Sequence, residues 1–261
     1  MRYFFTLLLL LVPILGVYTF VTADQHEWWF PPAVSSYAQE IDDLFNLIMW
    51  MVGIVFVVTE VCLAWFVFKY SKKRQDKGAF THGNHNLELV WTAIPSVALL
   101  FIAFKQMGTW ADIKFEKNFP ATGDFTRAKP ICEIWASQFD WRFRYPGDDG
   151  RLGTVDDIEN AFEFVVPVDK DIVFDLRSRD VIHSFFVPQF RVKQDALPGH
   201  TIPVWFRAQQ EGLYDLVCAE LCGWGHYKMA GRVRVVSDDE YKRRMADMKT
   251  AWFSNGTEER K

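Results

Sequence analysis

Long apolar runs constrain this chain more than any other feature of its sequence. Residues 44–68 read LFNLIMWMVGIVFVVTEVCLAWFVF, and a second apolar run extends from about Leu87 to Phe104. A bilayer interior offers no water to backbone N–H and C=O groups, so a run of this length crosses it as a helix. Pro95 in the second run is tolerated because neighbouring helices can satisfy the carbonyl group that it frees. Together the two runs predict a hairpin of membrane-spanning helices.

Positive charge gathers between these two runs. The segment Lys69–Lys77 reads KYSKKRQDK, and short loops rich in lysine and arginine stay on the cytoplasmic side of a membrane. The residues after Phe104 should therefore emerge on the opposite side, in the periplasm or an equivalent oxidising space. The net charge of the whole chain is −4, which is too small to identify a partner.

The first 20 residues, MRYFFTLLLLLVPILGVYTF, allow two interpretations. An early Arg, an apolar run and the small residues Val21-Thr22-Ala23 are typical of a secretory signal peptide with its cleavage site. The same residues could instead form a third membrane helix that begins in the cytoplasm. Both give the same topology, so residues 1–23 are expected to be a signal peptide or an extra helix. Residues 24–110 are then the helix hairpin with its cytoplasmic basic loop.

Short runs rich in Val, Ile, Phe, Trp and Tyr begin at Cys132 and alternate with Gly, Pro and Asp. This pattern is typical of a β-sandwich or β-barrel. The expected strands are Ile131–Trp135, Trp141–Tyr145, Glu163–Val166, Asp171–Arg177, Phe185–Val187, Thr201–Ala208, Gly212–Leu216 and Gly231–Val236. A final helix should begin at Ser237, whose hydroxyl can cap the backbone while Glu240 completes a capping box. The sequence has no Cys-x-x-Cys-His motif, which excludes a fused c-type haem domain.

A short segment near the end of the chain concentrates metal ligands. It reads Cys218-Ala-Glu220-Leu-Cys222-Gly-Trp224-Gly-His226-Tyr-Lys-Met229. Thiolate and imidazole donors favour copper, zinc or iron–sulfur clusters over magnesium and calcium. A thioether beside them favours copper over zinc, because a weak axial Met is typical of copper electron-transfer sites. A structural disulfide between Cys218 and Cys222 is the alternative, but it leaves His226 and Met229 without a role.

His183 is the candidate for a second nitrogen ligand. It lies in Asp180-Val-Ile-His183-Ser-Phe-Phe-Val-Pro188, an apolar segment of strand-like composition that proline ends. By itself, a histidine in such a segment is more often buried with a hydrogen-bond partner than bound to a metal. The sulfur-rich loop in the same chain favours the ligand role.

Three separated blocks, in the same order, resemble subunit II of the haem-copper respiratory oxidases, in the cytochrome c-oxidising branch. The blocks are Glu88-Leu-Val-Trp91-Thr-Ala-Ile-Pro95, then Asp180-Val-Ile-His183 with Val192-Lys-Gln-Asp195-Ala-Leu-Pro-Gly199, and then the segment from Cys218 to Met229. The resemblance implies a membrane-anchored all-β fold, in which the helix hairpin is followed by a cupredoxin-like Greek-key β-barrel. It assigns residues 111–236 to a periplasmic copper domain and residues 237–261 to a C-terminal helix.

The resemblance also implies a dinuclear copper centre called CuA. Its ligands would be two bridging thiolates, one imidazole for each copper, a weak axial thioether and a backbone carbonyl: Cys218 and Cys222, His183 and His226, Met229, and Glu220. The Glu220 side chain would also reach a magnesium ion shared with subunit I. An electron shared over both coppers and their sulfurs changes bond lengths little, so such a site serves as a relay, and the chemistry on oxygen belongs to a partner chain.

As a member of this family, the chain would be the subunit of a proton-translocating oxidase that accepts electrons from cytochrome c and passes them to haem in subunit I. Its partners would be subunits I and III, a soluble or membrane-bound cytochrome c and membrane lipid, with no nucleic acid. It would lie in the bacterial inner membrane with the copper domain on the periplasmic side. Two other classes remain as alternatives, which are a metal-free subunit of the quinol oxidase kind and a copper-delivery or nitrous oxide-reducing protein. The copper side chains argue against the first, and the hairpin with Glu88 argues against the second.

Glu88 opens the second apolar run, next to the basic loop. A solvated carboxylate stabilised by the helix dipole is one interpretation. The resemblance implies another, which is proton uptake at the mouth of the path called the K channel. Trp91 and Pro95 are in register with the family motif, and this favours the proton role.

The segment Trp135-Ala-Ser-Gln138-Phe139-Asp-Trp141-Arg-Phe143-Arg-Tyr145 resembles the aromatic segment of the family with one departure. Phe139 stands where the tryptophan that receives electrons is usual, and it lacks the indole N–H group. Trp224, inside the ligand loop, is the candidate substitute at the surface. Trp141 is expected to be a packing residue.

Four other features carry expectations. Glu60 lies deep in the first apolar run, where a neutral carboxyl hydrogen-bonded to a neighbouring helix is favoured over a proton relay. Cys62 and Cys132 are expected to be small buried hydrophobic residues. The carboxylates between Pro146 and Glu159 favour a solvated hairpin over a calcium site, because the EF-hand spacing is missing. The same loop could steer a basic cytochrome toward the domain.

Overall fold

The computed structural model describes residues 2–26, 28–70, 80, 82–120, 129–161 and 163–255. Most of the predicted basic loop, residues 71–77, lies outside the described residues. The chain forms two compact units. The first comprises Met1–Trp29 and Asp42–Gly108, and the second comprises Phe30–Ile41 and Thr109–Lys261.

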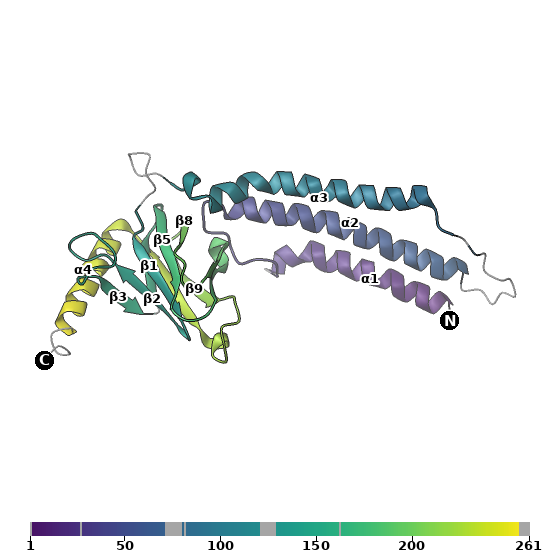
Figure 1. Cartoon of the computed structure of the whole chain (residues 1–261). Coiled ribbons are helices and arrows are strands. Elements are labelled where there is room, and N and C mark those ends of the chain that lie inside the picture. Colours follow the sequence, from purple (N-terminus) through teal and green to yellow (C-terminus); the bar gives the residue numbers. More distant parts are fainter. Residues whose placement is uncertain are drawn as a thin grey trace. The chain divides into compact units, whose positions relative to one another are not determined.

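Within the described residues, three helices are long enough and apolar enough to cross a membrane. They are α1 (Arg2–Ala23), α2 (Ala38–Tyr70) and α3 (His85–Lys114) (Figure 1). The apolar runs predicted at 44–68 and 87–104 lie inside α2 and α3, and each helix continues past its run into polar residues. The predicted helix hairpin is therefore confirmed, and Arg2–Ala23 form a further helix.

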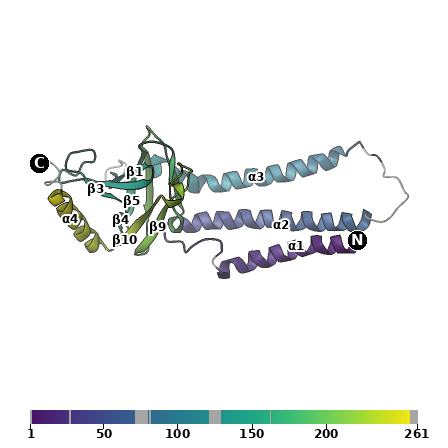
Figure 2. The ribbon, with the colours of Figure 1, turned by 90° about the horizontal axis from the view of Figure 1, so that it is seen from below.

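The helices α1 and α2 run antiparallel and lie side by side in both views of the ribbon (Figures 1 and 2). Tyr3 near the start of α1 contacts Phe68 near the end of α2, with 6.0 Å between ring centroids. Phe20 near the end of α1 contacts Trp50 at 5.0 Å. These contacts establish α1 as a helix that packs on α2, and both interpretations of residues 1–23, cleaved or retained, stay open.

Two residues of α2 depart from expectation. Cys62 is exposed, whereas the sequence predicts a buried residue; Cys132, in the second unit, is fully buried as predicted. Glu60 is half-buried, and no hydrogen-bond partner for it is found among the residues that the structure describes. An apolar helix is hydrophobic on all sides, so its sequence does not show which face meets protein and which meets lipid.

The second unit is a sandwich of two five-stranded sheets, with strand orders β3-β2-β1-β5-β8 and β4-β10-β9-β6-β7. The strands are β1 (Cys132–Ser137), β2 (Asp140–Tyr145), β3 (Ile158–Ala161), β4 (Glu163–Pro167), β5 (Asp171–Ser178), β6 (His183–Val187), β7 (Val192–Ala196), β8 (Ile202–Arg207), β9 (Gly212–Cys218) and β10 (Ala230–Val236). Each sheet combines antiparallel pairs with a parallel pair, β1 with β5 and β4 with β10. The predicted cupredoxin-like β domain is confirmed.

The strands predicted from the sequence are all present, with ends shifted by a residue or two. The strands β3 and β7 are not predicted. Their sequences, IENA and VKQDA, contain few apolar residues, so a period of two is not visible in them. Both lie at the edge of a sheet, where a single neighbour supplies the backbone hydrogen bonds and one face meets solvent.

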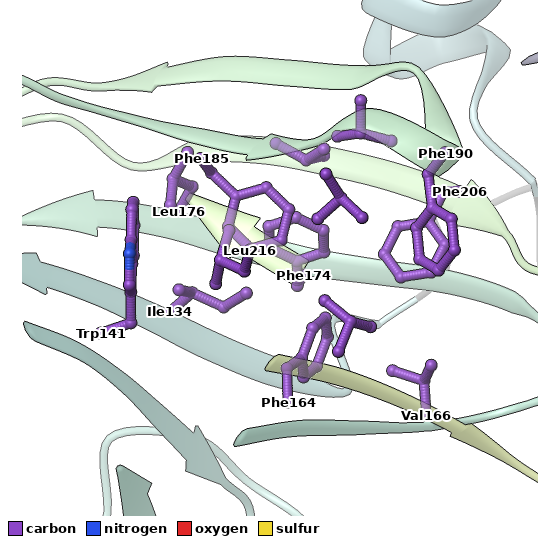
Figure 3. Packing of buried hydrophobic residues seen from close by; sticks show 14 of the residues in the cluster. Ile134, Trp141, Phe164, Val166, Phe174, Leu176, Phe185, Phe190, Phe206 and Leu216 are labelled. Carbon is purple, nitrogen blue, oxygen red and sulfur yellow. The ribbon is translucent and has the colours of Figure 1, made fainter. Parts of the chain in front are cut away.

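Aromatic side chains fill the space between the sheets (Figure 3). Phe164 on β4 lies among three other rings, with centroids at 5.4 Å for Phe143, 5.5 Å for Phe174 and 6.2 Å for Phe206. Ring pairs at this spacing stabilise a core beyond the area that they bury. Trp141 on β2 is fully buried, and its ring packs against those of Phe185 at 5.8 Å and His183 at 6.3 Å between centroids, as expected of a packing residue.

The segment Phe30–Ile41 joins the β unit although it precedes most of α2 in the chain. Val34 and Tyr37 belong to the buried core. The Tyr37 hydroxyl donates to the backbone carbonyl of Trp205 at 3.0 Å. The core of the second unit therefore includes residues that precede the helix hairpin in the sequence, although the strands of this unit follow the hairpin.

The helix α4 (Asp238–Asn255) packs on β3 and β4, outside the sandwich (Figure 2). Ser237 caps it as predicted, because its Oγ accepts the backbone N–H of Glu240 at 3.3 Å. The Glu240 carboxylate pairs with Arg244 at 2.7 Å, one turn further along the helix. The cap and this ion pair stabilise the first turns of α4.

Replacing Phe164 with Ala should lower the free energy of unfolding of the β unit by about 3–5 kcal/mol, because it leaves a cavity between the two sheets. Chemical unfolding of the purified chain in detergent, followed by near-ultraviolet circular dichroism, measures this loss. Val155→Ala is the matched control, since that side chain is 96% exposed, and it should change stability by less than about 0.5 kcal/mol. Equal effects of the two substitutions would contradict the role of Phe164.

Candidate metal centre

The predicted metal-binding loop connects β9 to β10. Cys218 is the last residue of β9, and the loop passes through a one-turn helix, η4 (His226–Lys228), before it reaches Met229. The Cys218 N–H donates to the Met229 carbonyl at 3.1 Å, so the end of the loop returns to the strand that it left. Gly223 has a φ of +135°, a conformation that favours glycine, and it turns the chain directly after Cys222.

Sulfur and nitrogen atoms from this loop and from β6 converge. The Sγ atoms of Cys218 and Cys222 lie 3.8 Å apart. His183 Nδ1 lies 3.9 Å from Cys218 Sγ, and His226 Nδ1 lies 3.7 Å from Cys222 Sγ. Met229 Sδ is also 3.7 Å from Cys222 Sγ. The structure therefore brings together every side chain that the sequence predicts as a copper ligand.

The two loop cysteines are free thiols, so the alternative of a disulfide between Cys218 and Cys222 is not formed. Both are buried, as is Met229, and His183 is fully buried. The Cys218 Sγ also lies 3.2 Å from the backbone carbonyl oxygen of Glu220, while the Glu220 side chain is exposed. The ligand atoms of His183, Cys218 and Cys222 all lie within 4.8 Å of one another, a spacing at which they could hold a metal ion.

Asp180 orients His183. Its Oδ1 lies 2.8 Å from His183 Nε2, so that nitrogen carries the hydrogen bond and Nδ1 is left facing the Cys218 thiol. Asp180 also accepts the backbone N–H groups of Gln138 and Val181, each at 2.7 Å. These bonds lower the pKa of the Asp180 carboxyl even though burial opposes its ionisation. A carboxylate that holds the outer nitrogen of a histidine is the usual support for a metal ligand.

The two thiols ionise differently. Burial opposes ionisation of Cys218, but hydrogen bonding to His183 and to the backbone at Ser184 outweighs it and lowers the pKa to about 6. For Cys222, burial and then the negative charge of Cys218 raise the pKa to about 11. Ionisation of Cys218 is therefore favoured over that of Cys222, and a cation bound by both sulfur atoms would favour loss of both protons.

The hairpin between β1 and β2 covers the loop. Gln138 Nε2 donates to the Cys222 carbonyl at 2.5 Å. The Phe139 ring lies against the backbone of both glycines that flank Trp224. A Cβ atom on Gly223 would meet the Phe139 ring at 3.2 Å, and one on Gly225 would meet it at 2.5 Å. The Gly-Trp-Gly sequence therefore allows an aromatic ring to lie directly on the ligand loop.

Trp224 lies at the surface of this loop, where 77% of it is exposed. Its ring centroid is 5.2 Å from that of Phe139 in an edge-to-face arrangement. Lys228 Nζ lies 4.7 Å from the Trp224 ring centroid. The residues that the sequence predicts for electron transfer, Phe139 and Trp224, are thus in contact, with Trp224 outside and Phe139 beneath it.

Glu88 belongs to the first compact unit and lies exposed in the first turn of α3. Asn84 caps this helix, because its Oδ1 accepts the N–H of Leu87 at 3.2 Å. The positive end of the helix dipole stabilises a carboxylate at this position. The position agrees with the dipole interpretation, and the proton role of Glu88 stays a prediction.

Several carboxylates between β2 and β3 bond within their own loop, while Asp148 pairs with Lys249 on α4. Asp157 Oδ2 accepts the backbone N–H groups of Gly153 at 2.7 Å and Thr154 at 3.3 Å. The Thr154 hydroxyl donates to Asp156 at 2.7 Å. The strands β2 and β3 are antiparallel neighbours, so the predicted hairpin is confirmed. The loop follows Tyr145, at the end of β2 opposite to the Phe139 hairpin.

Sequence reasoning identified every converging donor but missed two supporting residues, Asp180 and Gln138. Asp180 precedes His183 by three residues, in the same sequence block, and this spacing is a signal for a carboxylate that orients a histidine. Gln138 gives no such signal, because its partner is a backbone carbonyl distant in the chain.

Two family models match the chain. The model for the cytochrome c oxidase subunit II transmembrane domain matches residues 23–108, and the model for the cytochrome c oxidase subunit II periplasmic domain matches residues 136–236. Both matched segments carry the sequence blocks described above.

Similar proteins include the alternative cytochrome c oxidase subunit 2 of Bradyrhizobium diazoefficiens, which is 32% identical over 246 residues that cover 85% of each chain. The cytochrome c oxidase subunit 2 of Cereibacter sphaeroides is 31% identical over 243 residues, covering 81% of this chain and 77% of the relative. Among solved structures, the periplasmic domain of subunit II of cytochrome oxidase (CoxB) of Bradyrhizobium japonicum is 32% identical with a TM-score of 0.43. That match covers 49% of this chain and 98% of that one.

The contact between Phe139 and Gly225 can be tested by substitution. Gly225 has a φ of −92°, which alanine accepts, so Gly225→Ala acts mainly through its overlap with the Phe139 ring. We expect Gly225→Ala to displace the loop and to weaken copper affinity about tenfold. Overpacking costs about 1–3 kcal/mol, and about 1.4 kcal/mol corresponds to a factor of ten in affinity. Copper titration of the metal-free protein measures the loss.

The double variant Phe139→Ala with Gly225→Ala removes the overlap and should recover part of the lost affinity. Single Phe139→Ala is the control for loss of the ring itself. Unchanged affinity in Gly225→Ala, or no recovery in the double variant, would show that Phe139 does not shape the loop.

Proposed function

The chain belongs to the cytochrome c oxidase subunit II family, and from this premise we propose that it is the electron-accepting subunit of a membrane oxidase. It takes electrons from cytochrome c at a dinuclear copper centre and passes them to haem in subunit I, where oxygen is reduced with proton pumping. Family membership and the apolar helices make it a membrane protein that associates with other oxidase subunits. We propose the bacterial inner membrane as its location, with the β unit on the periplasmic side.

The convergence of two free thiols, two imidazoles and a thioether carries the proposal. This donor set fits copper better than zinc, because a structural zinc site is completed by Cys or His, and a weak thioether beside thiolate and imidazole is typical of copper. The side chains that would hold copper are His183, Cys218, Cys222, His226 and Met229, together with the carbonyl of Glu220. Copper bound there would supply one-electron oxidation and reduction at modest cost in geometry.

The chain itself keeps these donors in place. The Cys218 to Met229 backbone bond closes the loop, Gln138 holds the Cys222 carbonyl, and Asp180 orients the buried His183. Donors fixed in this way need little rearrangement when charge changes, and small rearrangement keeps the barrier to electron transfer low. Phe139 covers the two glycines of the loop, and Cys222 between the strand and these glycines is buried.

Electrons reach the centre through the aromatic pair. Trp224 offers an exposed ring to a donor protein, and Phe139 links that ring to the backbone on either side of it. This pair replaces the single tryptophan that is usual in the family at the position of Phe139. The exposed Glu220 side chain meets the magnesium ion shared with subunit I, and Glu88 takes up protons at the start of α3. The partners are subunits I and III, cytochrome c and membrane lipid.

Spectroscopy of the copper-loaded oxidase tests the function. A dinuclear centre should give a purple colour, a near-infrared band and a multi-line copper EPR signal, all of which disappear in Cys222→Ser. Cys62→Ser is the matched control, because this thiol is exposed on α2, and it should keep the full signal. A subunit of the metal-free quinol oxidase kind would show none of these signals in the parent protein and would retain its turnover in Cys222→Ser, and either result would refute the proposal.

Rapid reduction by cytochrome c tests the aromatic pair. Trp224→Ala should slow reduction of the copper centre about tenfold, the size expected when one exposed aromatic contact at an interface is lost. Trp141→Phe, which changes a core residue, should leave the rate within about twofold. The near-infrared band is recorded in both variants to confirm metal content. Equal rates in the two variants would contradict the role of Trp224.

A further inference from the structure

A cluster of arginines surrounds Trp135 on the outer face of the sheet β3-β2-β1-β5-β8. In the strand register, Trp135 on β1 lies between Arg142 on β2 and Arg177 on β5. The guanidinium carbons of Arg144, Arg177 and Arg179 lie 5.7, 5.1 and 5.4 Å from the Trp135 ring centroid. Packing of the Trp135 ring does not by itself require three guanidinium groups within cation–π distance. We call Arg142, Arg144, Arg177 and Arg179 the arginine face.

Carboxylates lie beneath the arginine face rather than above it. The arginine side chains are 27–42% exposed, whereas the carboxylate side chains that contact them, Glu133, Asp140, Asp157 and Glu159, are only 7–23% exposed. In each of these ion pairs the arginine is therefore the more exposed member. The deeper carboxylates and the Trp135 ring hold the guanidinium groups in position.

Among the described residues, Arg177 and Arg179 make no carboxylate contact at good hydrogen-bond distance, although the Arg177 Nε atom itself is buried. The nearest carboxylate contact is 3.6 Å for Arg177, to Glu133, and 3.8 Å for Arg179, to Glu159. Both distances exceed those of a good hydrogen bond. A guanidinium has five N–H donors in a rigid fork that matches a carboxylate. Two arginines that are positioned but incompletely bonded are suited to bind carboxylates from outside.

The arginine face is continuous with the exposed aromatic pair. Arg179 donates its backbone N–H to Ala136 at 3.0 Å, and the next residue, Asp180, binds the backbone of Gln138 at 2.7 Å. Phe139 follows directly and contacts Trp224, above whose ring Lys228 lies. An apolar centre with a charged rim is the usual anatomy of a protein–protein interface.

We propose that the arginine face and Lys228 dock an electron-donor protein that presents carboxylates around its own redox centre. The proposal rests on the proposed function and identifies the chemical class of the partner. Trp224 would contact the apolar centre of the donor, and Arg177 and Arg179 would pair with its acidic rim. Most of the acidic loop between β2 and β3 does not compete for this role, because it follows Tyr145 at the other end of β2, and its Asp157 already contacts Arg144.

Charge reversal in the assembled oxidase tests this proposal. Reduction of the copper centre is followed by stopped flow after mixing with either an acidic soluble c-type cytochrome or a basic one, at low and high salt. The parent oxidase should react faster with the acidic donor at low salt, and the advantage should shrink as salt rises. Arg177→Glu with Arg179→Glu should slow the acidic donor about tenfold and speed the basic one.

Two further variants keep the test decisive. Arg177→Gln with Arg179→Gln should change the rates in the same direction by a smaller factor, and it serves if charge reversal next to Glu133 prevents folding. Arg243→Glu, an exposed charge on α4, is the control and should stay within about twofold of the parent.

The outcomes separate this proposal from the proposed function. The copper band and its bleaching by dithionite are recorded in every sample, and their absence would count against the copper centre itself. If the band is intact, a faster reaction with the basic donor at low salt would overturn the docking proposal, as would variants that behave like Arg243→Glu. Loss of another subunit from the purified complex, with donor kinetics unchanged, would assign the arginine face to assembly and would also overturn it.

Discussion

Contacts between the β1–β2 hairpin and the β9–β10 loop hold the sulfur donors of this protein in place. Gln138 binds the Cys222 carbonyl, and the Phe139 ring lies on the two glycines that flank Trp224. In the same hairpin, the backbone N–H of Gln138 donates to Asp180. Asp180 in turn orients His183, the first residue of β6. A short loop by itself would sample many conformations, and ordering it costs free energy. Two sheets packed together through their aromatic core contribute to that ordering.

Burial then gives the site its chemistry. The thiols and His183 are removed from water, and a buried polar group without a partner is costly. Asp180 bonds His183, and the two sulfur atoms contact His183, His226 and each other. The result is an uneven pair of cysteines, with the pKa of Cys218 lowered and that of Cys222 raised. Metal binding resolves this imbalance because a cation stabilises both thiolates, so metal binding and proton release are linked.

Positive and negative side chains around the site differ in exposure and in position along the sheet. Beside the aromatic pair, the guanidinium groups are more exposed than the carboxylates that they contact, and most of the acidic loop lies at the far end of β2. Buried carboxylates hold arginines in fixed positions, which lowers the conformational cost of docking. The net charge of −4 conceals this arrangement, because it sums groups that a partner would never meet together.

The sequence by itself determined the apolar helices, most of the strands and the side chains that converge at the candidate metal centre. Apolar runs of membrane length can only be helices, alternating β-formers with Gly and Pro punctuation produce the sandwich strands, and two thiols, two imidazoles and a thioether have few uses besides metal binding. Tertiary structure decided the rest. The edge strands β3 and β7, the exposed face of α2 at Cys62, the joining of Phe30–Ile41 to the β unit and the support from Gln138 all depend on residues distant in the chain. The arginine face exists for the same reason, because strand pairing places side chains from β1, β2 and β5 side by side, and local sequence cannot specify that register.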